Sequence, residues 1–171
     1  HKPVGEGDSG PNTGGMGAYS PAPVMTPELC EKARTEIVEP LVRAMAANGA
    51  PFKGVFYAGL MITDGAPKLL EVNVRFGDPE CQPLMARFRG DLLEVLWLTA
   101  AGRLAEANFD FDKRTACCVV LCSEGYPGAY PKGRVITGID TAQADDIVVF
   151  HAGTCVNHEG DLVTSGGRVL S

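Results

Sequence analysis

Histidine is scarce in this sequence, and its cysteines lack the spacing of metal ligands. Only three histidines occur among 171 residues, and the six cysteines form no C-x-x-C pair. Structural zinc sites need four such ligands at short spacings. Three of the cysteines lie in the apolar run TACCVVLC, where a free thiol packs like a small hydrophobic side chain: Cys117, Cys118 and Cys122. We expect reduced, structural cysteines and a cytoplasmic protein.

Long runs of one kind of residue are also missing. The 15 basic and 21 acidic residues are scattered and give a net charge of -6. This argues against nucleic acid as a partner, although small anionic ligands need only a few local donors. No apolar run reaches membrane-spanning length, so we expect no membrane partner. With 45% hydrophobic residues, the chain can bury a core in one or two domains.

Both ends of the sequence read as the interior of something longer. The chain begins at His1 without methionine, and it stops at GGRVLS, a strand pattern without a closing helix or polar tail. We expect a piece of a longer polypeptide.

The first half of the chain predicts a glycine-rich segment, then a helix. Residues 5–17 hold six glycines, which disfavours regular structure there. Residues 27–48 show helical periodicity interrupted at Pro40, with Thr26 as the N-cap and Gly49 as the stop.

A hairpin and two more helices are expected next. Two strands flank Asp64-Gly65, a hairpin turn signal. Helical patterns follow from Pro79, broken near Gly90, and the second has Asp91 as its cap. Beyond residues 108–113, where we place a boundary, short strands alternate with Gly and Pro turns.

The stretch KLLEVNVRF carries polar residues along one face of its expected strand. Alternate side chains share a face, so one face would bury against a helix (Leu70, Val72, Val74 and Phe76) and the other would present Leu69, Glu71, Asn73 and Arg75. A carboxylate and an amide oxygen suit Mg²⁺, and a guanidinium suits a phosphate or carboxylate beyond it. The alternative is a solvent-facing strand on which Glu71 and Arg75 pair.

The continuation GDP has two interpretations. Asp78 can cap a helix that starts at Pro79. Alternatively, the Gly77 N–H and the Asp78 carboxylate point into the space beside the polar strand face, where a helix N-terminus also favours anions.

The glycine-rich segment GDSGPNTGGMG allows backbone N–H groups to approach a phosphate or an oxyanion. Asp8, Asn12 and Thr13 could add side-chain contacts, and Lys2 could reach a phosphate. The segment is neither a Walker A loop nor G-x-G-x-x-G after a strand. A flexible connection is the alternative.

Several segments, in order, resemble the phosphoribosylamine–glycine ligase family of the ATP-grasp superfamily. EVNVRFGDPECQ resembles the metal-binding strand and signature of these enzymes, and HKPVGEGDSGPNTGGMGAYSPAP their glycine-rich segment. GVFYAGLMI lies between them, and GYPGAYPKGRVITG, VFHAGT and VTSGGRVL resemble their C-terminal domain. The resemblance implies an α+β fold: the C-terminal part of an ATP-grasp domain, with a mixed or antiparallel sheet, over residues 1–110, then an incomplete β-rich domain over 111–171.

The resemblance further implies an ATP-dependent carbon–nitrogen ligase of purine biosynthesis, which joins glycine to 5-phospho-β-D-ribosylamine through a glycyl phosphate. Glu71 and Asn73 would be Mg²⁺ or Mn²⁺ ligands, and Arg75 and Asp78 catalytic residues. Lys2 and Asn12 match positions near the nucleotide. The substrate side would be lined by Asp8, Thr13, Gly14, Gly15, Gly77 and Asp78.

The family's upstream part has no counterpart here, so we expect this chain alone to bind nucleotide weakly and turn over nothing. Rival interpretations are another ATP-grasp carboxylate–amine ligase, a non-catalytic interaction module and a purely structural β-rich domain. Four basic residues of the last third could reach substrate, but we expect them at a solvated surface: Lys132, Arg134, His151 and Arg168.

Overall fold

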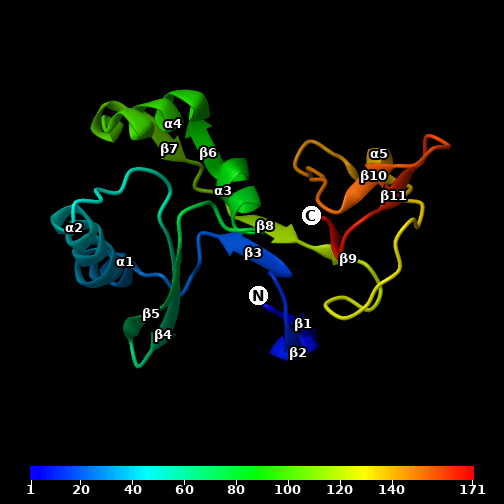
Figure 1. Cartoon of the computed structure of the whole chain (residues 1–171), viewed down its shortest axis with the longest axis horizontal. Helices are drawn as coiled ribbons and strands as arrows, with labels where there is room; N and C mark the ends of the chain where they lie inside the picture. Colours follow the sequence, from blue (N-terminus) through cyan, green and yellow to red (C-terminus); the bar gives the residue numbers. More distant parts are fainter. The chain divides into compact units, whose positions relative to one another are not determined.

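The computed structural model describes all residues, His1–Ser171, as helices and strands in two units (Figure 1). One unit comprises residues 1–19, 78–86 and 116–171, and the other comprises residues 20–77 and 87–115. The expected α+β class is confirmed, and the strands pair two by two. None of the helices has the length and apolar character needed to cross a membrane.

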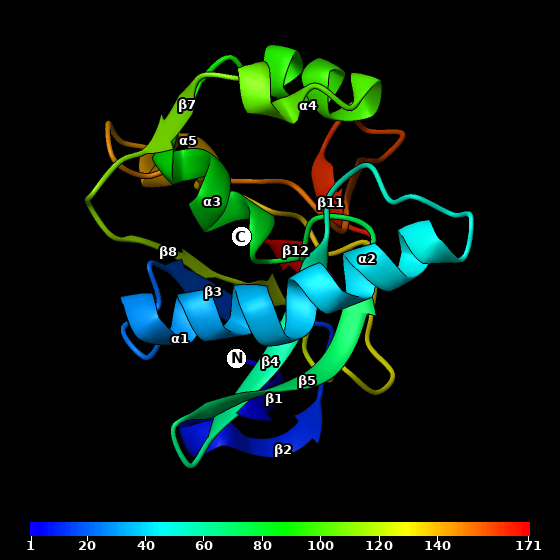
Figure 2. The same ribbon diagram turned by 90° about the vertical axis from the view of Figure 1, so that its left-hand side faces the viewer.

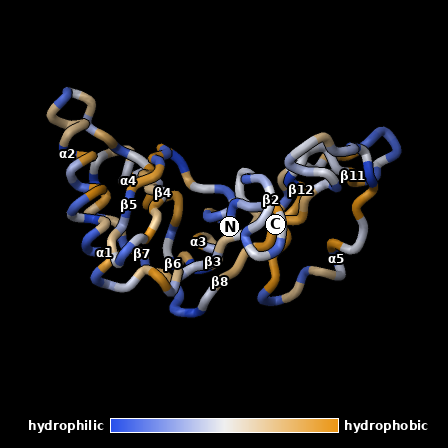
Figure 3. The backbone as a smooth tube through the Cα atoms, turned by 90° about the horizontal axis from the view of Figure 1, so that it is seen from below, coloured by the Kyte–Doolittle hydropathy of each residue, from blue (hydrophilic) through white to orange (hydrophobic).

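The second unit begins with the predicted helical segment. It comprises α1 (Pro27–Ala33), the π-helical turn η2 (Arg34–Val38) and α2 (Glu39–Ala47). Thr26 caps α1 as expected, since its hydroxyl accepts from the Leu29 N–H at 3.3 Å. The π turn ends two residues before Pro40, which has no N–H for the helical ladder. Figure 3 shows the hydrophilic residues of this segment along one side of the coil.

The predicted hairpin is confirmed as β4 (Tyr57–Thr63) and β5 (Ala66–Asn73), an antiparallel pair. Asp64 and Gly65 form its turn with φ of 53° and 70°. The left-handed values of both residues match the right-handed twist of the two strands. Helix α1 lies against this hairpin (Figure 2).

A β-bulge shifts the face assignment within β5. Leu60 pairs with Leu69 and Gly59 pairs with Glu71, which leaves Leu70 as the extra residue. Cross-strand partners share a face, so Leu69 points away from the face of Glu71. The expectation that Leu69 shares that face is therefore wrong, because the inserted residue interrupts the simple alternation.

The expected burial of the apolar face is also wrong for three of its residues. Leu70, Val72 and Val74 are 64%, 40% and 69% exposed, whereas Phe76 is half-buried. The strand itself ends at Asn73 and the chain bends. The bulge and this bend break the regular ladder on which the two-residue period depends.

The remainder of this unit contains elements predicted only in part. It comprises β6 (Phe88–Gly90), α4 (Leu92–Ala101), the 3₁₀ turn η3 (Leu104–Glu106) and β7 (Phe109–Phe111). The break near Gly90 is confirmed, and the Asp91 side chain caps α4 by accepting from the Glu94 N–H at 3.1 Å. The antiparallel pairing of β6 with β7 was not foreseen.

The first unit is built from short strands. They are β1 (Pro3–Gly5), β2 (Ser9–Asn12), β3 (Gly17–Ser20), β8 (Ala116–Val119), β9 (Leu121–Cys122), β10 (Thr154–Val156), β11 (Leu162–Thr164) and β12 (Arg168–Leu170). Three helical pieces join them: η1 (Glu6–Asp8), α3 (Cys81–Arg87) and α5 (Ile139–Ala142). The neighbours are β1 with β2, β3 with β8, β9 with β12 and β10 with β11.

The glycine-rich segment is more regular than expected. Most of it forms the β1–β2 hairpin, so the expectation of irregular structure across residues 5–17 is wrong. Gly7 and Gly10 take φ of 64° and 82° at its tip and in β2. Glycine adopts such values without steric cost, so here it permits the hairpin.

The core of this unit lies in its C-terminal strands and includes Val120, Val163 and Val169. Cys118 is also buried, as expected for a thiol that packs as a hydrophobe. Cys117 and Cys122 are exposed, so for them the expectation of packing is wrong. Side chains of this stretch alternate between the core and solvent.

Candidate functional site

The first group of candidate residues lies on one face of the β4–β5 hairpin. Glu71 is opposite Gly59 and Asn73 is opposite Tyr57, so all four share a face. A Cβ on Gly59 would lie 2.7 Å from the Glu71 Cγ and 3.4 Å from its Oε1, so the missing side chain leaves space for the carboxylate. A carboxylate and an amide oxygen side by side are hard donors that fit a divalent cation such as Mg²⁺.

Arg75 is placed differently from the sequence-based expectation. It lies in the bend after Asn73, outside β5, and its Nη1 donates to the Phe76 carbonyl at 2.7 Å. Its predicted position on the strand face of Glu71 and Asn73 is wrong, because the strand ends too early. The guanidinium is exposed and belongs to the same unit as those two residues.

Asp78 does not cap a helix. Residues 78–80 form a turn and α3 begins at Cys81, so the expected helix start at Pro79 is wrong. The Asp78 carboxylate instead has two side-chain partners. Its Oδ2 lies 2.9 Å from the Arg168 Nη2, and its Oδ1 accepts from the Gln82 Nε2 at 3.1 Å.

Residues 13–15 of the glycine-rich segment belong to the same unit as Asp78 and lie beside it. A Cβ on Gly15 would come within 2.5 Å of the Pro79 Cδ and 3.1 Å of the Asp78 carbonyl oxygen. Thr13 orders this loop, since its hydroxyl donates to the Lys2 carbonyl at 2.7 Å and accepts from the Gly15 N–H at 3.0 Å. The structure thus shows an anchored loop rather than a flexible connection.

The other predicted residues lie along the β1–β2 hairpin. Lys2 precedes β1, and Asn12 ends β2 opposite Pro3. Asp8 has φ of 56°, and its Oδ1 lies 3.7 Å from the His1 Nδ1. All three candidates are exposed. Gly77 is buried where the chain passes from one unit to the other.

Two contacts to this loop, from Arg168 and Tyr126, were not expected from the sequence. Arg168, expected at a solvated surface, has a side chain only 23% exposed, so that expectation is wrong. Tyr126 accepts from the Gly14 N–H at 3.2 Å. Both contacts span more than 100 residues of sequence between loop and partner. The one sequence signal for a role of Arg168 was its position in VTSGGRVL, a segment that resembles the family's C-terminal domain. The other three basic residues are exposed as expected: Lys132, Arg134 and His151.

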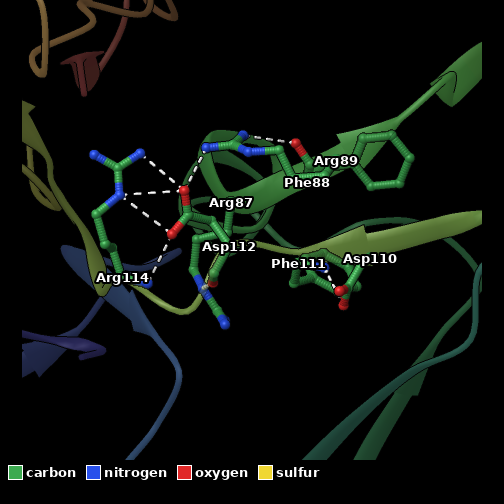
Figure 4. A network of polar contacts seen from close by, with 7 residues as sticks. All are labelled: Arg87, Phe88, Arg89, Asp110, Phe111, Asp112 and Arg114. Atoms are coloured by element: carbon green, nitrogen blue, oxygen red, sulfur yellow. Dashed lines mark hydrogen bonds and ion pairs between the residues drawn. The ribbon is translucent and has the colours of Figure 1, made fainter.

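A second polar cluster, in the other unit, surrounds Asp112 (Figure 4). Its Oδ2 lies 2.6 Å from the Arg89 Nη2 and 2.8 Å from the Arg114 Nη2. Arg87 donates from Nε to the Asp112 carbonyl at 2.9 Å and from Nη1 to the Ser20 hydroxyl at 2.6 Å. Hydrogen bonds from the Arg114 side chain and backbone, then from Arg89, hold the pKa of the Asp112 carboxyl well below its usual range. The cluster joins distant segments of its unit, and we assign it a structural role.

Two models of one protein family match most of the chain. Residues 1–81 match the family model of the phosphoribosylglycinamide synthetase ATP-grasp (A) domain, and residues 116–171 match that of the C domain of the same enzyme. The fold is thus that of an ATP-grasp protein. The chain belongs to the phosphoribosylglycinamide synthetase family, which confirms the resemblance seen in the sequence.

Several relatives resemble the chain over its whole length. The phosphoribosylamine–glycine ligase of Mesorhizobium japonicum is 56% identical over 171 residues, which are 100% of this chain and 40% of that protein. The chloroplastic enzyme of Arabidopsis thaliana is 53% identical over 174 residues, with 99% and 33% covered. The crystal structure of phosphoribosylamine–glycine ligase from Thermotoga maritima superposes with a TM-score of 0.82 at 33% identity, covering 99% of this chain and 41% of that one. The chain therefore spans about two fifths of the length of the Mesorhizobium relative.

Proposed function

We propose that the polypeptide carrying these residues joins glycine to 5-phospho-β-D-ribosylamine in an ATP-dependent step of de novo purine biosynthesis. The products are glycinamide ribonucleotide, ADP and phosphate. The observation that carries the proposal is the 56% identity of the entire chain to a phosphoribosylamine–glycine ligase. We further propose a cytoplasmic location, with small molecules and neither nucleic acid nor membrane as partners.

The proposed reaction has two bond-forming steps. A glycine carboxylate oxygen bonds to the γ-phosphorus of ATP, and ADP leaves with the bonding electron pair. The ribosylamine nitrogen then bonds to the acyl carbon of glycyl phosphate, phosphate leaves with the C–O electrons, and the nitrogen loses one proton. Because the amine attacks, no covalent intermediate with the protein is needed, and positioning and charge neutralisation suffice.

Glu71 and Asn73 would hold the divalent metal, Mg²⁺ or Mn²⁺, because they place two hard oxygen donors on one strand face. When bound, such an ion supplies charge neutralisation to the phosphates. Arg75 would balance negative charge on the transferred phosphoryl group. A flexible, exposed guanidinium can turn from the Phe76 carbonyl towards a phosphate.

The remaining candidates would bind nucleotide and substrates. We propose Lys2 and Asn12 near the nucleotide. For glycine and the ribosylamine phosphate we propose Asp8, Thr13, Gly14, Gly15, Gly77 and Asp78. The anchoring of Thr13 and Gly15 supports this, because an ordered loop presents its N–H groups at fixed positions. We also propose the sequence division into an ATP-grasp part, 1–110, and a C-terminal part, 111–171.

A second proposal concerns the chain by itself. It spans 40% of its Mesorhizobium relative, which favours a catalytically silent chain that gains activity only with the remaining upstream part of the same polypeptide. Within ATP-grasp ligases, a different acid and amine pair is the alternative for the active protein.

ADP release from ATP and Mg²⁺ tests these proposals. It is measured with glycine and phosphoribosylamine together and singly, for this chain and for the full-length polypeptide that carries it. We expect release only from the longer protein and only with both substrates. Release that needs some other acid and amine would refute the substrate assignment, and activity of the short chain would refute its silence.

The metal assignment has its own test in the longer protein. Glu71→Gln should lower kcat/KM by at least about 100-fold and weaken metal binding, because a charged ligand is lost. Glu36→Gln is a matched control, since Glu36 is exposed on the helical segment of the same unit and should change neither quantity. Equal behaviour of the two variants would contradict the assignment.

A further inference from the structure

Arg168 joins three acceptors from two distant segments of the first unit. It stands at the start of β12, opposite Cys122 of β9. Its Nη1 donates to the Asp78 carbonyl at 2.8 Å and to the Gly15 carbonyl at 3.3 Å, while its Nη2 lies 2.9 Å from the Asp78 Oδ2. A planar guanidinium can satisfy several acceptors at once in one fixed orientation.

The fit between this guanidinium and the loop depends on two glycines. A Cβ on Gly14 would lie 2.9 Å from the Arg168 Nη2 and 3.0 Å from its Cζ. A Cβ on Gly15 would meet Pro79, whose side chain is fully buried. At Gly15 the loop therefore lies against Pro79 at a distance that no larger residue permits, and at Gly14 a larger residue would displace the Arg168 guanidinium.

The C-terminal end of the chain makes a second contact to the same segment. Gln82 donates from Nε2 to the Asp78 Oδ1 at 3.1 Å and to the Ser171 hydroxyl at 3.2 Å. The carboxylate of Asp78 is thus held on one oxygen by Arg168 and on the other by Gln82. Arg168 at the start of β12 and Ser171 just after its end thus hold Asp78 and Gln82.

We infer that Arg168 is a positioning residue for the ligase reaction, an inference that rests on the proposed function. It sets the orientation of Asp78 and the place of residues 13–15, which we propose to contact the substrates, and does not itself act on the reacting atoms. Catalysis by positioning is sensitive to displacements of about 1 Å, which can cost about 100-fold in rate. Loss of the Arg168 side chain should therefore slow the reaction by displacing Asp78 and residues 13–15.

The first test measures positioning without any reaction. Amide hydrogen exchange is followed in the full-length polypeptide with Arg168→Met. We expect faster exchange in residues 13–16, where the Gly15 N–H bonds to Thr13 and the Gly14 N–H to Tyr126, and unchanged exchange in β4 and β5. Unchanged exchange in residues 13–16 would overturn the inference. If Arg168→Met does not fold, the same comparison is made with Arg168→Lys.

The second test uses the reaction. Arg168→Met should lower kcat/KM for glycine by about 100-fold. Arg168→Lys should recover part of this, and added methylguanidinium should restore Arg168→Ala, which a merely structural loss would not allow. Arg134→Met is the control, because that exposed arginine lies 3.8 Å from Glu124 in the same unit and should retain full activity. Activity of Arg168→Met within twofold of wild type, or no recovery with either lysine or methylguanidinium, would overturn the inference.

The two tests separate this inference from the proposed function. If the wild-type protein makes no glycinamide ribonucleotide, the proposed function fails, and hydrogen exchange alone still decides whether Arg168 positions the loop. If the wild type is active and the exchange of residues 13–16 is unchanged in the variant, the proposed function stands and the role of Arg168 fails.

Discussion

Asp78 and Asp112 are both held by arginine side chains, yet their partners come from very different distances along the chain. Arg89 and Arg114 lie 23 and 2 residues from Asp112, and these contacts close around the β6–β7 pair. Arg168 lies 90 residues from Asp78. The ion pairs of Asp112 therefore form between β6 and the residues just after β7, whereas the ion pair of Asp78 exists only when the C-terminal strands of its unit are in place.

The two carboxylates also differ in the residues that surround them. Around Asp112 the contacts join Arg87 and Ser20 into a network within one unit. Around Asp78 the contacts fix Gly15 and Gln82, next to residues that we propose to contact substrate. The comparison teaches that similar ion pairs serve different ends, so changes at Asp78 should alter the reaction and changes at Asp112 should alter acid stability.

The largest expected difference is in the reaction of the full-length polypeptide. Asp78→Asn keeps the shape of the side chain but removes the charge that faces Arg168, so the loop and the signature should shift and kcat/KM for glycine should fall by about 100-fold. Asp112→Asn should stay within twofold of wild type. Steady-state kinetics measure kcat/KM for both variants. A similar fall in kcat/KM in the two would show that Asp78 and Asp112 do not differ in their effect on the reaction.

A smaller effect is expected when the contact of Gly15 with the turn is disturbed. Gly15→Ala places a Cβ within 2.5 Å of Pro79 at φ of 125°, so strain and overpacking should together cost at least about 2 kcal/mol of the free energy of unfolding. Urea denaturation measures this cost.

Gly65→Ala is the matched control for that prediction. The φ of Gly65 is 70° and nothing lies within 4 Å of an added Cβ. Only the left-handed backbone conformation should therefore lower the free energy of unfolding, by about 1 kcal/mol. An equal loss of stability in the two alanine variants would show that close packing at Gly15 contributes nothing.

The smallest effect concerns acid stability at Asp112. Its pKa is lowered in the folded chain, above all by the Arg114 side chain, so its contribution is complete above the ordinary Asp pKa of about 3.9 and is lost as the pH falls from there. The difference in urea midpoint between wild type and Asp112→Asn should be constant at neutral pH and shrink at pH 3. High salt should also reduce it, because exposed charges are screened. A difference that grows on acidification would contradict the assignment.

Elements fixed by neighbouring residues were predictable from the sequence. The Asp64-Gly65 turn needs two residues that tolerate left-handed φ, and the caps Thr26 and Asp91 need a short polar side chain before a helix. Each of these depends on a few consecutive residues. The shared face of Glu71 and Asn73 was predictable for the same reason, since the ladder is regular between them.

Features decided at a distance were not predictable. The bulge at Leu70 depends on how β5 registers against β4, and nothing in KLLEVNVRF marks the extra residue. Asp78 had the sequence of a helix cap, but its carboxylate is engaged by Arg168 and Gln82, and α3 starts three residues later. Long-range partners of this kind leave no periodic signal in a single sequence.

The two units are made of alternating segments of the chain, which has a consequence for protein engineering. The backbone changes units after Tyr19, Gly77, Ala86 and Thr115. A truncation after Thr115 would remove β8 and leave β3 without its hydrogen-bonded neighbour, and it would also remove Arg168 from Asp78. The segments of the first unit enclose those of the second, so a cut after Thr115 keeps the second unit whole and divides the first. No continuous segment of the chain therefore carries the first unit alone.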